Sequence, residues 1–239
     1  MGAVLCLMLV EGPFDRQRLS VLSELFDKDK LVLIPFGTDV LQIKDYYKEY
    51  RTRINSILSK EKTHELTDFA EIVQVCDTDG CFISDDKIFE NNEISKIVYG
   101  VDTILVRDKT SIINAHKNKR ENINQILESK EIILFYNSTN VDHAFDNIQN
   151  PSNFEKRTKS MDMFSKYKND GFKLLEILVE LCPDLHSYEN TWNYIKEGNN
   201  SLKRSSNILH FVIKHFDELK EIYQIRLRKL IEKGGVKDG

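Results

Sequence analysis

The first part of the chain alternates between short apolar runs and longer segments that place apolar residues at helical spacing. Four of the runs have the length and β-branched content of buried strands: residues 3–10, 30–36, 70–76 and 131–136. Three other segments predict helices: residues 15–26, 40–60 and 111–129. This alternation predicts an α/β fold with a mainly parallel sheet flanked by helices.

The second part of the chain has a different pattern, because strand-like runs are replaced by helical spacing after residue 144. Predicted helices cover residues 154–168, 172–182, 188–197 and 207–233. In the first part of the chain, residues 93–106 are expected to hold a helix start and a short strand. We therefore expect an α/β domain over residues 1–143 and a helical C-terminal region, residues 144–239, packed on it.

The composition is that of a soluble globular protein, since 41% of the 239 residues are hydrophobic and 30% are charged. No stretch approaches the roughly 20 apolar residues that a membrane-spanning helix needs, so we expect a cytoplasmic protein without a membrane partner. The four cysteines lack the paired spacing of a metal site and are expected to be reduced. The net charge of −4 hides an excess of Lys and Arg in parts of the second half, which leaves room for a polyanionic partner.

Two carboxylates stand at the end of the third apolar run. Asp77 and Asp79 lie two residues apart and are followed by Gly80, which allows a sharp turn. Close carboxylates repel each other unless a cation or a shared proton lies between them. Hard oxygen ligands of this kind suit Mg²⁺ or Mn²⁺, so the pair predicts a metal site.

A third carboxylate, Glu11, ends the first apolar run, and Asp15 follows it by four residues. Functional groups of parallel sheets gather at the carboxyl ends of the strands. If the strands that start near residues 3 and 70 are neighbours, Glu11 would meet Asp77 and Asp79 in one crevice. The sequence does not show whether these two strands are adjacent.

Two further groups of polar residues are candidates for the surroundings of this crevice. Four residues after the last apolar run are expected at its periphery: Ser138, Asn140, Asp142 and His143. Five basic residues are candidates for binding nucleic acid: Lys117, Lys119, Arg120, Lys203 and Arg204. Basic side chains hold phosphates through salt-dependent contacts, although such clusters are also typical of a solvated helix face.

Taken together, residues 7–12 (LMLVEG), Asp15 and residues 75–79 (VCDTD) resemble the Toprim family. This family is the catalytic domain of topoisomerases, bacterial primases and small nucleases. The resemblance implies a nuclease that cleaves RNA or DNA, with Mg²⁺ or Mn²⁺ held by Glu11, Asp77 and Asp79 and with Asp15 as a further candidate ligand. Glu11 would be either a ligand or the general acid/base.

The chain is also similar, more loosely, to small stand-alone Toprim-like proteins that occur beside ATPases in bacterial anti-phage loci. That similarity implies a defence effector with a possible ATPase partner. Two other hypotheses stay open. In the first, the chain is a non-catalytic regulatory subunit of such an ATPase. In the second, it is a phosphatase of the haloacid dehalogenase class, with Asp77 as nucleophile and Asp79 as acid/base. An acidic turn without any ligand is the alternative to all of them.

Overall fold

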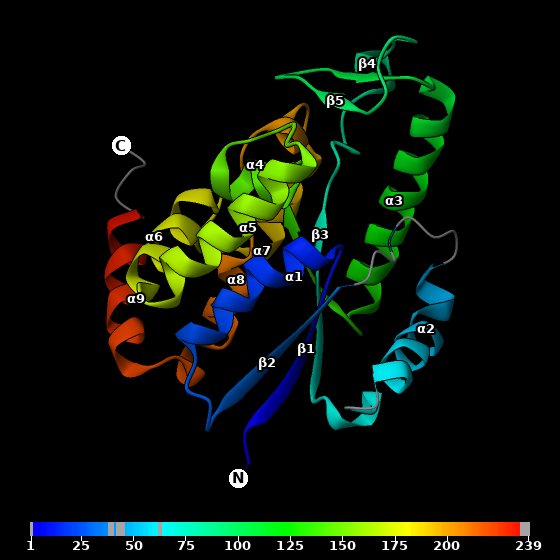
Figure 1. The fold of residues 1–239 in the computed structure, drawn as a ribbon. Coiled ribbons are helices and arrows are strands. Elements are labelled where there is room, and N and C mark those ends of the chain that lie inside the picture. The colour runs from blue at the N-terminus through cyan, green and yellow to red at the C-terminus, as the bar shows by residue number, and fades with distance from the viewer. Residues whose placement is uncertain (1, 38–40, 42–45, 62–63, 235–239) are drawn as a thin grey trace.

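The core of the protein is a four-stranded parallel sheet with the strand order β2-β1-β3-β7 (Figure 1). We analysed a computed structural model that describes residues 2–37, 41, 46–61 and 64–234. The strands are β1 (Val4–Val10), β2 (Leu31–Gly37), β3 (Glu71–Asp77) and β7 (Ile133–Asn137). The predicted α/β fold with a parallel sheet is confirmed.

The neighbours of β3 decide which residues meet at the carboxyl edge of the sheet. β3 pairs with β1 on one side, where Leu9 lies opposite Gln74, and with β7 on the other, where Asp77 lies opposite Asn137. The adjacency of the first and third strands, which the sequence left open, is therefore present. Glu11 follows β1 directly, so it emerges at the same edge.

Most residues of β1, β3 and β7 are buried on both faces, because helices cover the sheet from both sides, whereas β2 at the edge is only partly buried (Figure 1). Met8 and Val75 contribute to one hydrophobic core, whereas Leu7 and Cys76 contribute to the other. This alternation follows the two-residue period of a strand. All four cysteines are buried and free.

Helices of the C-terminal region and α1 together cover the hydrophobic core that contains Met8 and Val75. That core is formed with α1 (Pro13–Leu19), α4 (Val141–Asp146), α5 (Asn153–Lys168), α6 (Gly171–Leu181), α8 (Leu209–Lys214) and α9 (Glu221–Gly234). The second core lies under α2 (Tyr46–Glu61) and α3 (Lys109–Ser129). α7 (Tyr188–Lys196) packs along β7, where the rings of Trp192 and Tyr136 meet edge to face. Part of the predicted helix 40–60, residues 40 and 42–45, lies outside the described residues.

A small second sheet stands above the carboxyl edge of the main sheet (Figure 1). Its strand order is β4-β6-β5, formed by β4 (Ile88–Glu90), β5 (Val98–Tyr99) and β6 (Ile104–Val106). The expectation for residues 93–106 is only half right, since they contain two short strands and no helix. Strands of two or three residues leave too little pattern in a sequence to be predicted.

The predicted single helix 207–233 is wrong. The chain forms α8, a 3₁₀ turn (Phe216–Glu218) and then α9. His215 breaks the helix because its ring packs on Phe26 and Phe211 while its Nε2 atom pairs with Glu71 at 2.7 Å. These tertiary contacts outweigh the local helical pattern.

Candidate metal centre

The ends of three adjacent strands bring Glu11, Asp77 and Asn137 together. The backbone N–H of Asp77 donates to Oε1 of Glu11 at 3.1 Å, across β1 and β3. On the other side, Nδ2 of Asn137 donates to Oδ1 of Asp77 at 3.3 Å. The structure therefore confirms that Glu11 and Asp77 lie next to each other, and it adds Asn137, which the sequence analysis did not single out.

The turn after β3 directs Asp79 back towards the sheet edge. Asp79 and Gly80 both have left-handed backbone conformations, with φ values of 50° and 67°. A Cβ atom on Gly80 would lie 2.7 Å from side-chain atoms of Ile104 and Leu202, so only glycine fits. The backbone N–H of Asp79 donates to the carbonyl of Thr139 at 2.9 Å, which ties this turn to the segment after β7.

Lys119 of α3 is the cation of the site. Its Nζ donates to Oδ2 of Asp79 at 2.5 Å and to Oε1 of Glu11 at 3.0 Å, and the residue is only 2% exposed. Burial alone would lower the pKa of Lys119, but the carboxylates of Asp79 and Glu11 outweigh it and raise the pKa well above its usual value. The predicted contact of Lys119 with nucleic acid does not fit this burial, because a lysine so enclosed holds carboxylates together.

The carboxylates still outnumber the cations that face them. Burial raises the pKa of Asp77 well above its usual value, and Glu11, Asp15 and Asp79 raise it further. Burial, followed by the charge of Asp142, raises the pKa of Asp15 to about 6. Without a further cation, burial and these neighbouring carboxylates disfavour the ionised form of Asp77.

Tyr99 from the small sheet closes one side of the site. Its hydroxyl donates to Oδ1 of Asp79 at 3.3 Å, and burial, followed by the charge of Asp79, raises the pKa of Tyr99 well above its usual value. β5 itself is held by Asn150, whose side chain exchanges hydrogen bonds with the backbone of Tyr99. The small sheet thus positions a neutral hydrogen-bond donor on Asp79.

The four residues predicted at the periphery are buried and serve the local structure. Asp142 pairs with Arg18 at 2.5 Å, and Arg18 also pairs with Asp146 at 2.6 Å. Asn140 caps α4 by accepting a hydrogen bond from the backbone N–H of His143. The Ser138 hydroxyl accepts a hydrogen bond from the backbone N–H of Ser205. Nδ1 of the His143 ring lies 3.2 Å from the Thr139 hydroxyl.

The basic residues predicted to bind nucleic acid divide into two groups. Lys117 and Lys203 are exposed, and Nζ of Lys203 donates to Oδ1 of Asn200 at 2.8 Å. Arg120 donates to the carbonyl of Cys81 at 2.5 Å, and Arg204 donates to the carbonyl of Ala144 and to Glu180. Lys117 and Lys203 are therefore the candidates that remain available for phosphate.

The donor set fits a hard divalent cation. Within residues 2–37, 41, 46–61 and 64–234, no three side chains of His, Cys, Asp or Glu are grouped closely enough to hold a metal ion by themselves. Mg²⁺, however, keeps several waters and is usually bound through one or two carboxylates together with substrate phosphates. Asp77, together with the Glu11 carboxylate that Lys119 also contacts, can supply these one or two carboxylates. Asp15 is a further carboxylate close enough to raise the pKa of Asp77.

His116 lies close to this charge cluster on α3. It is 4% exposed, and its Nδ1 atom has no hydrogen-bond partner among the described residues. Burial lowers the pKa of His116 to about 4, against the opposing charge of Asp79. The imidazole is therefore neutral in the folded protein at pH 7.

We expect His116 to weaken the fold as the pH falls. From its usual pKa of 6.5 down to about 4, the unfolded chain binds a proton that the folded chain does not, so stability falls with falling pH. His116→Leu removes this difference. Between pH 7 and pH 5, the free energy of unfolding of the wild type should drop by about 2 kcal/mol more than that of the variant. Urea unfolding at both pH values measures this, and equal drops would contradict it.

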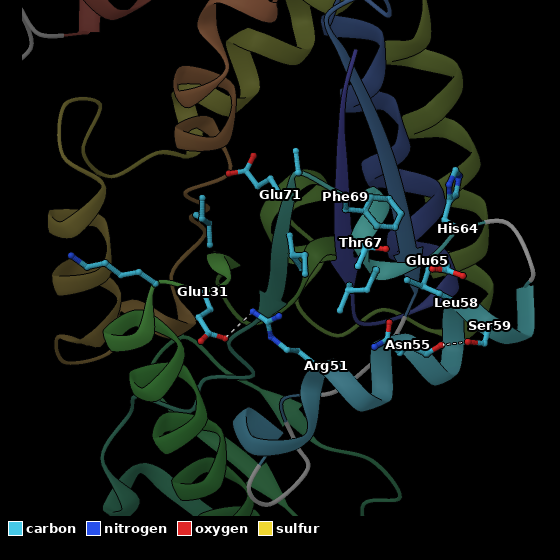
Figure 2. Close-up of a pocket in the computed structure, with 15 residues that line it drawn as sticks. Arg51, Asn55, Leu58, Ser59, His64, Glu65, Thr67, Phe69, Glu71 and Glu131 are labelled. Carbon is cyan, nitrogen blue, oxygen red and sulfur yellow. Dashed lines mark hydrogen bonds and ion pairs between the residues drawn. The ribbon is translucent and has the colours of Figure 1, made fainter. Parts of the chain in front are cut away.

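A cavity lies at the opposite, amino edge of the sheet (Figure 2). It measures about 820 Å³ and is lined by residues of α2, the start of β3 and the segment after α3. Two of its carboxylates are in ion pairs, because Glu131 pairs with Arg51 and Glu71 pairs with His215. Since Glu71 and Asp77 are the first and last residues of β3, this cavity is separate from the carboxylate site.

No protein-family model, curated protein or solved structure matches this chain. The similarity of its motifs to the Toprim family therefore stays a prediction. In the part of the chain that the structure describes, no helix is long and apolar enough to cross a membrane.

Proposed function

We propose that this protein is a nuclease that uses Mg²⁺ or Mn²⁺ to hydrolyse phosphodiester bonds of RNA or DNA. The observation that supports this most is the cluster of carboxylates at the carboxyl edge of the sheet, where burial raises the pKa of Asp77 well above its usual value and Glu11, Asp15 and Asp79 raise it further. A divalent cation relieves that repulsion. Sites with perturbed carboxylates at this edge of a parallel sheet are typical of catalysis.

Asp77 and Glu11 would hold the cation. When bound, it would polarise the scissile phosphate and stabilise charge on the leaving oxygen. Lys119 keeps Glu11 and Asp79 in place through its two ion pairs. Asp15, with a pKa of about 6, is suited to accept the proton of the attacking water near neutral pH. Because Glu11 already accepts hydrogen bonds from Lys119 and from the backbone of Asp77, we assign the proton transfer to Asp15 rather than to Glu11.

Nucleic acid is the substrate class that the surroundings favour. Lys117 lies on α3, the helix that carries Lys119, but on a different face of it, and Lys203 follows Leu202, which lies beside Gly80. Both lysines are exposed, so their ammonium groups are available to phosphates that flank the scissile bond.

One observation favours a second candidate, a non-catalytic subunit that binds a partner such as an ATPase. The ammonium of Lys119 already neutralises part of the carboxylate cluster, which a protein without a metal would need. In addition, α5 exposes Phe154 and Met161, at 76% and 53%, and exposed apolar side chains suit contact with a protein. Under either function, we propose a role in bacterial anti-phage defence.

Cleavage assays separate these functions. We expect the purified protein to cut end-labelled RNA or DNA in Mg²⁺ or Mn²⁺, and not in EDTA. Asp102→Asn, which changes an exposed carboxylate of the small-sheet region, should cleave like the wild type. A protein that binds neither metal nor nucleic acid would contradict the nuclease. Hydrolysis of p-nitrophenyl phosphate that requires Asp77 but not Glu11 would instead indicate the phosphatase.

A further inference from the structure

Asn137 carries a buried oxygen that the fold leaves without a partner. The residue is 1% exposed, and its Oδ1 atom has no hydrogen-bond partner among the described residues. Its Nδ2 atom donates to Oδ1 of Asp77 at 3.3 Å. The amide is therefore directed at Asp77, while its carbonyl oxygen is removed from water and unused.

Other buried asparagines of the same region are fully used. Oδ1 of Asn207 accepts from the N–H of Tyr136 at 2.7 Å, and its Nδ2 donates to Thr191 at 3.0 Å. Asn140 and Asn200 likewise use both ends of their amides. Buried polar atoms in folded proteins are normally paired, so the orphaned oxygen of Asn137 needs an explanation of its own.

The position of Asn137 supplies that explanation. It is the last residue of β7 and lies directly opposite Asp77, the last residue of β3, in the parallel register. Parallel strand partners place their side chains on the same face of the sheet. The Asn137 side chain therefore lies on the same face of the sheet as the Asp77 carboxylate, and rotation of its amide about the Cβ–Cγ bond would turn Oδ1 towards that carboxylate.

We propose that Oδ1 of Asn137 is a neutral oxygen ligand of the divalent cation held by Asp77. Amide carbonyls are ordinary ligands of hard divalent cations. A neutral ligand adds coordination without adding to the repulsion among Glu11, Asp15 and Asp77. The inference rests on the proposed metal-dependent function, and it names a residue for which the carboxylate motifs give no indication.

Calorimetric titration with Mn²⁺ tests this. Asn137→Ala should bind Mn²⁺ about 10- to 100-fold more weakly than the wild type, in the range found when residues around a metal site are removed. Asn140→Ala is the matched control, because it removes a buried asparagine three residues away that caps α4, and it should change the affinity less than about threefold. Equal affinities of Asn137→Ala and the wild type would overturn the proposal.

A second variant gives a direct readout even if Asn137→Ala folds poorly. Asn137→Cys puts a small thiol at the same place, and soft thiolate ligands favour Cd²⁺ over Mn²⁺. We expect weaker Mn²⁺ binding, together with a new ultraviolet thiolate-to-Cd²⁺ absorption that neither the wild type nor Asn140→Cys shows. No new absorption would overturn the assignment of Asn137.

The two proposals fail in different ways. Wild type that binds no Mn²⁺ overturns both the metal-dependent function and the assignment of Asn137. Wild type that binds Mn²⁺ through Asn137 but cleaves no nucleic acid overturns the nuclease and supports the ligand assignment.

Discussion

Replacement of Asp77 by asparagine is expected to reduce cleavage by about 10³-fold, because the cation would lose its central carboxylate. The same change should raise the free energy of unfolding in the absence of divalent cations. Burial and the carboxylates of Glu11, Asp15 and Asp79 disfavour the ionised form of Asp77, and an asparagine carries no charge at any pH. This gain in the free energy of unfolding should disappear at a pH below the pKa of Asp77 in the unfolded chain, because Asp77 is then neutral in both states.

Two measurements check this pair of effects. Initial rates of cleavage at saturating Mg²⁺ report the activity, and urea unfolding in EDTA reports the stability. Asp102→Asn serves as the control in both, since Asp102 is exposed and only 3.9 Å from Lys87 in a surface pair. A variant Asp77→Asn that is fully active, or that is less stable than the wild type in EDTA at pH 7, would contradict the proposed site.

Replacement of Lys119 by methionine is expected to lower the free energy of unfolding by about 3–5 kcal/mol in EDTA. The substitution leaves Glu11 and Asp79 without their buried cation, and breaking a buried ion pair from one side is costly in this range. Added Mn²⁺ should restore about 2–3 kcal/mol at a concentration near 100 times its Kd. A divalent cation held by Asp77 and Glu11 would then neutralise part of the negative charge that the ammonium neutralised.

The matched control is Lys117→Met, on the same helix and two residues earlier. Lys117 is exposed, so its replacement should change stability by less than about 0.5 kcal/mol. Thermal and urea unfolding with and without Mn²⁺ provide the comparison. If Mn²⁺ raised the free energy of unfolding of neither Lys119→Met nor Lys117→Met, no cation would bind beside Glu11.

Much of the site was predictable because strand ends are visible in a sequence. The apolar runs that end at Glu11 and Asp77 marked two carboxyl ends of strands, and parallel sheets gather functional groups there. The pairing of β1 with β3 was the missing step, since strand order depends on contacts between residues far apart in the chain. The predicted helices α5, α6 and α7 are confirmed to within a few residues.

Other parts of the site could not be predicted because they depend on tertiary contacts. Lys119 belongs to a cluster of basic residues, and nothing in its spacing distinguishes it from the exposed Lys117. One indication was available: Lys119 lies one helical turn before Ile123 and one turn after His116, both of which are buried in the same helix. Tyr99 comes from a two-residue strand, which is too short for any periodic pattern.

The most direct test of the metal centre is a calorimetric titration of the wild type and of Glu11→Gln with Mn²⁺. Glu11 and Asp77 come from different strands and meet only in the folded protein. We predict that the wild type binds Mn²⁺ and that Glu11→Gln binds it at least about tenfold more weakly. Equal affinities, or no binding to the wild type at a pH where its carboxylates are ionised, would contradict the site.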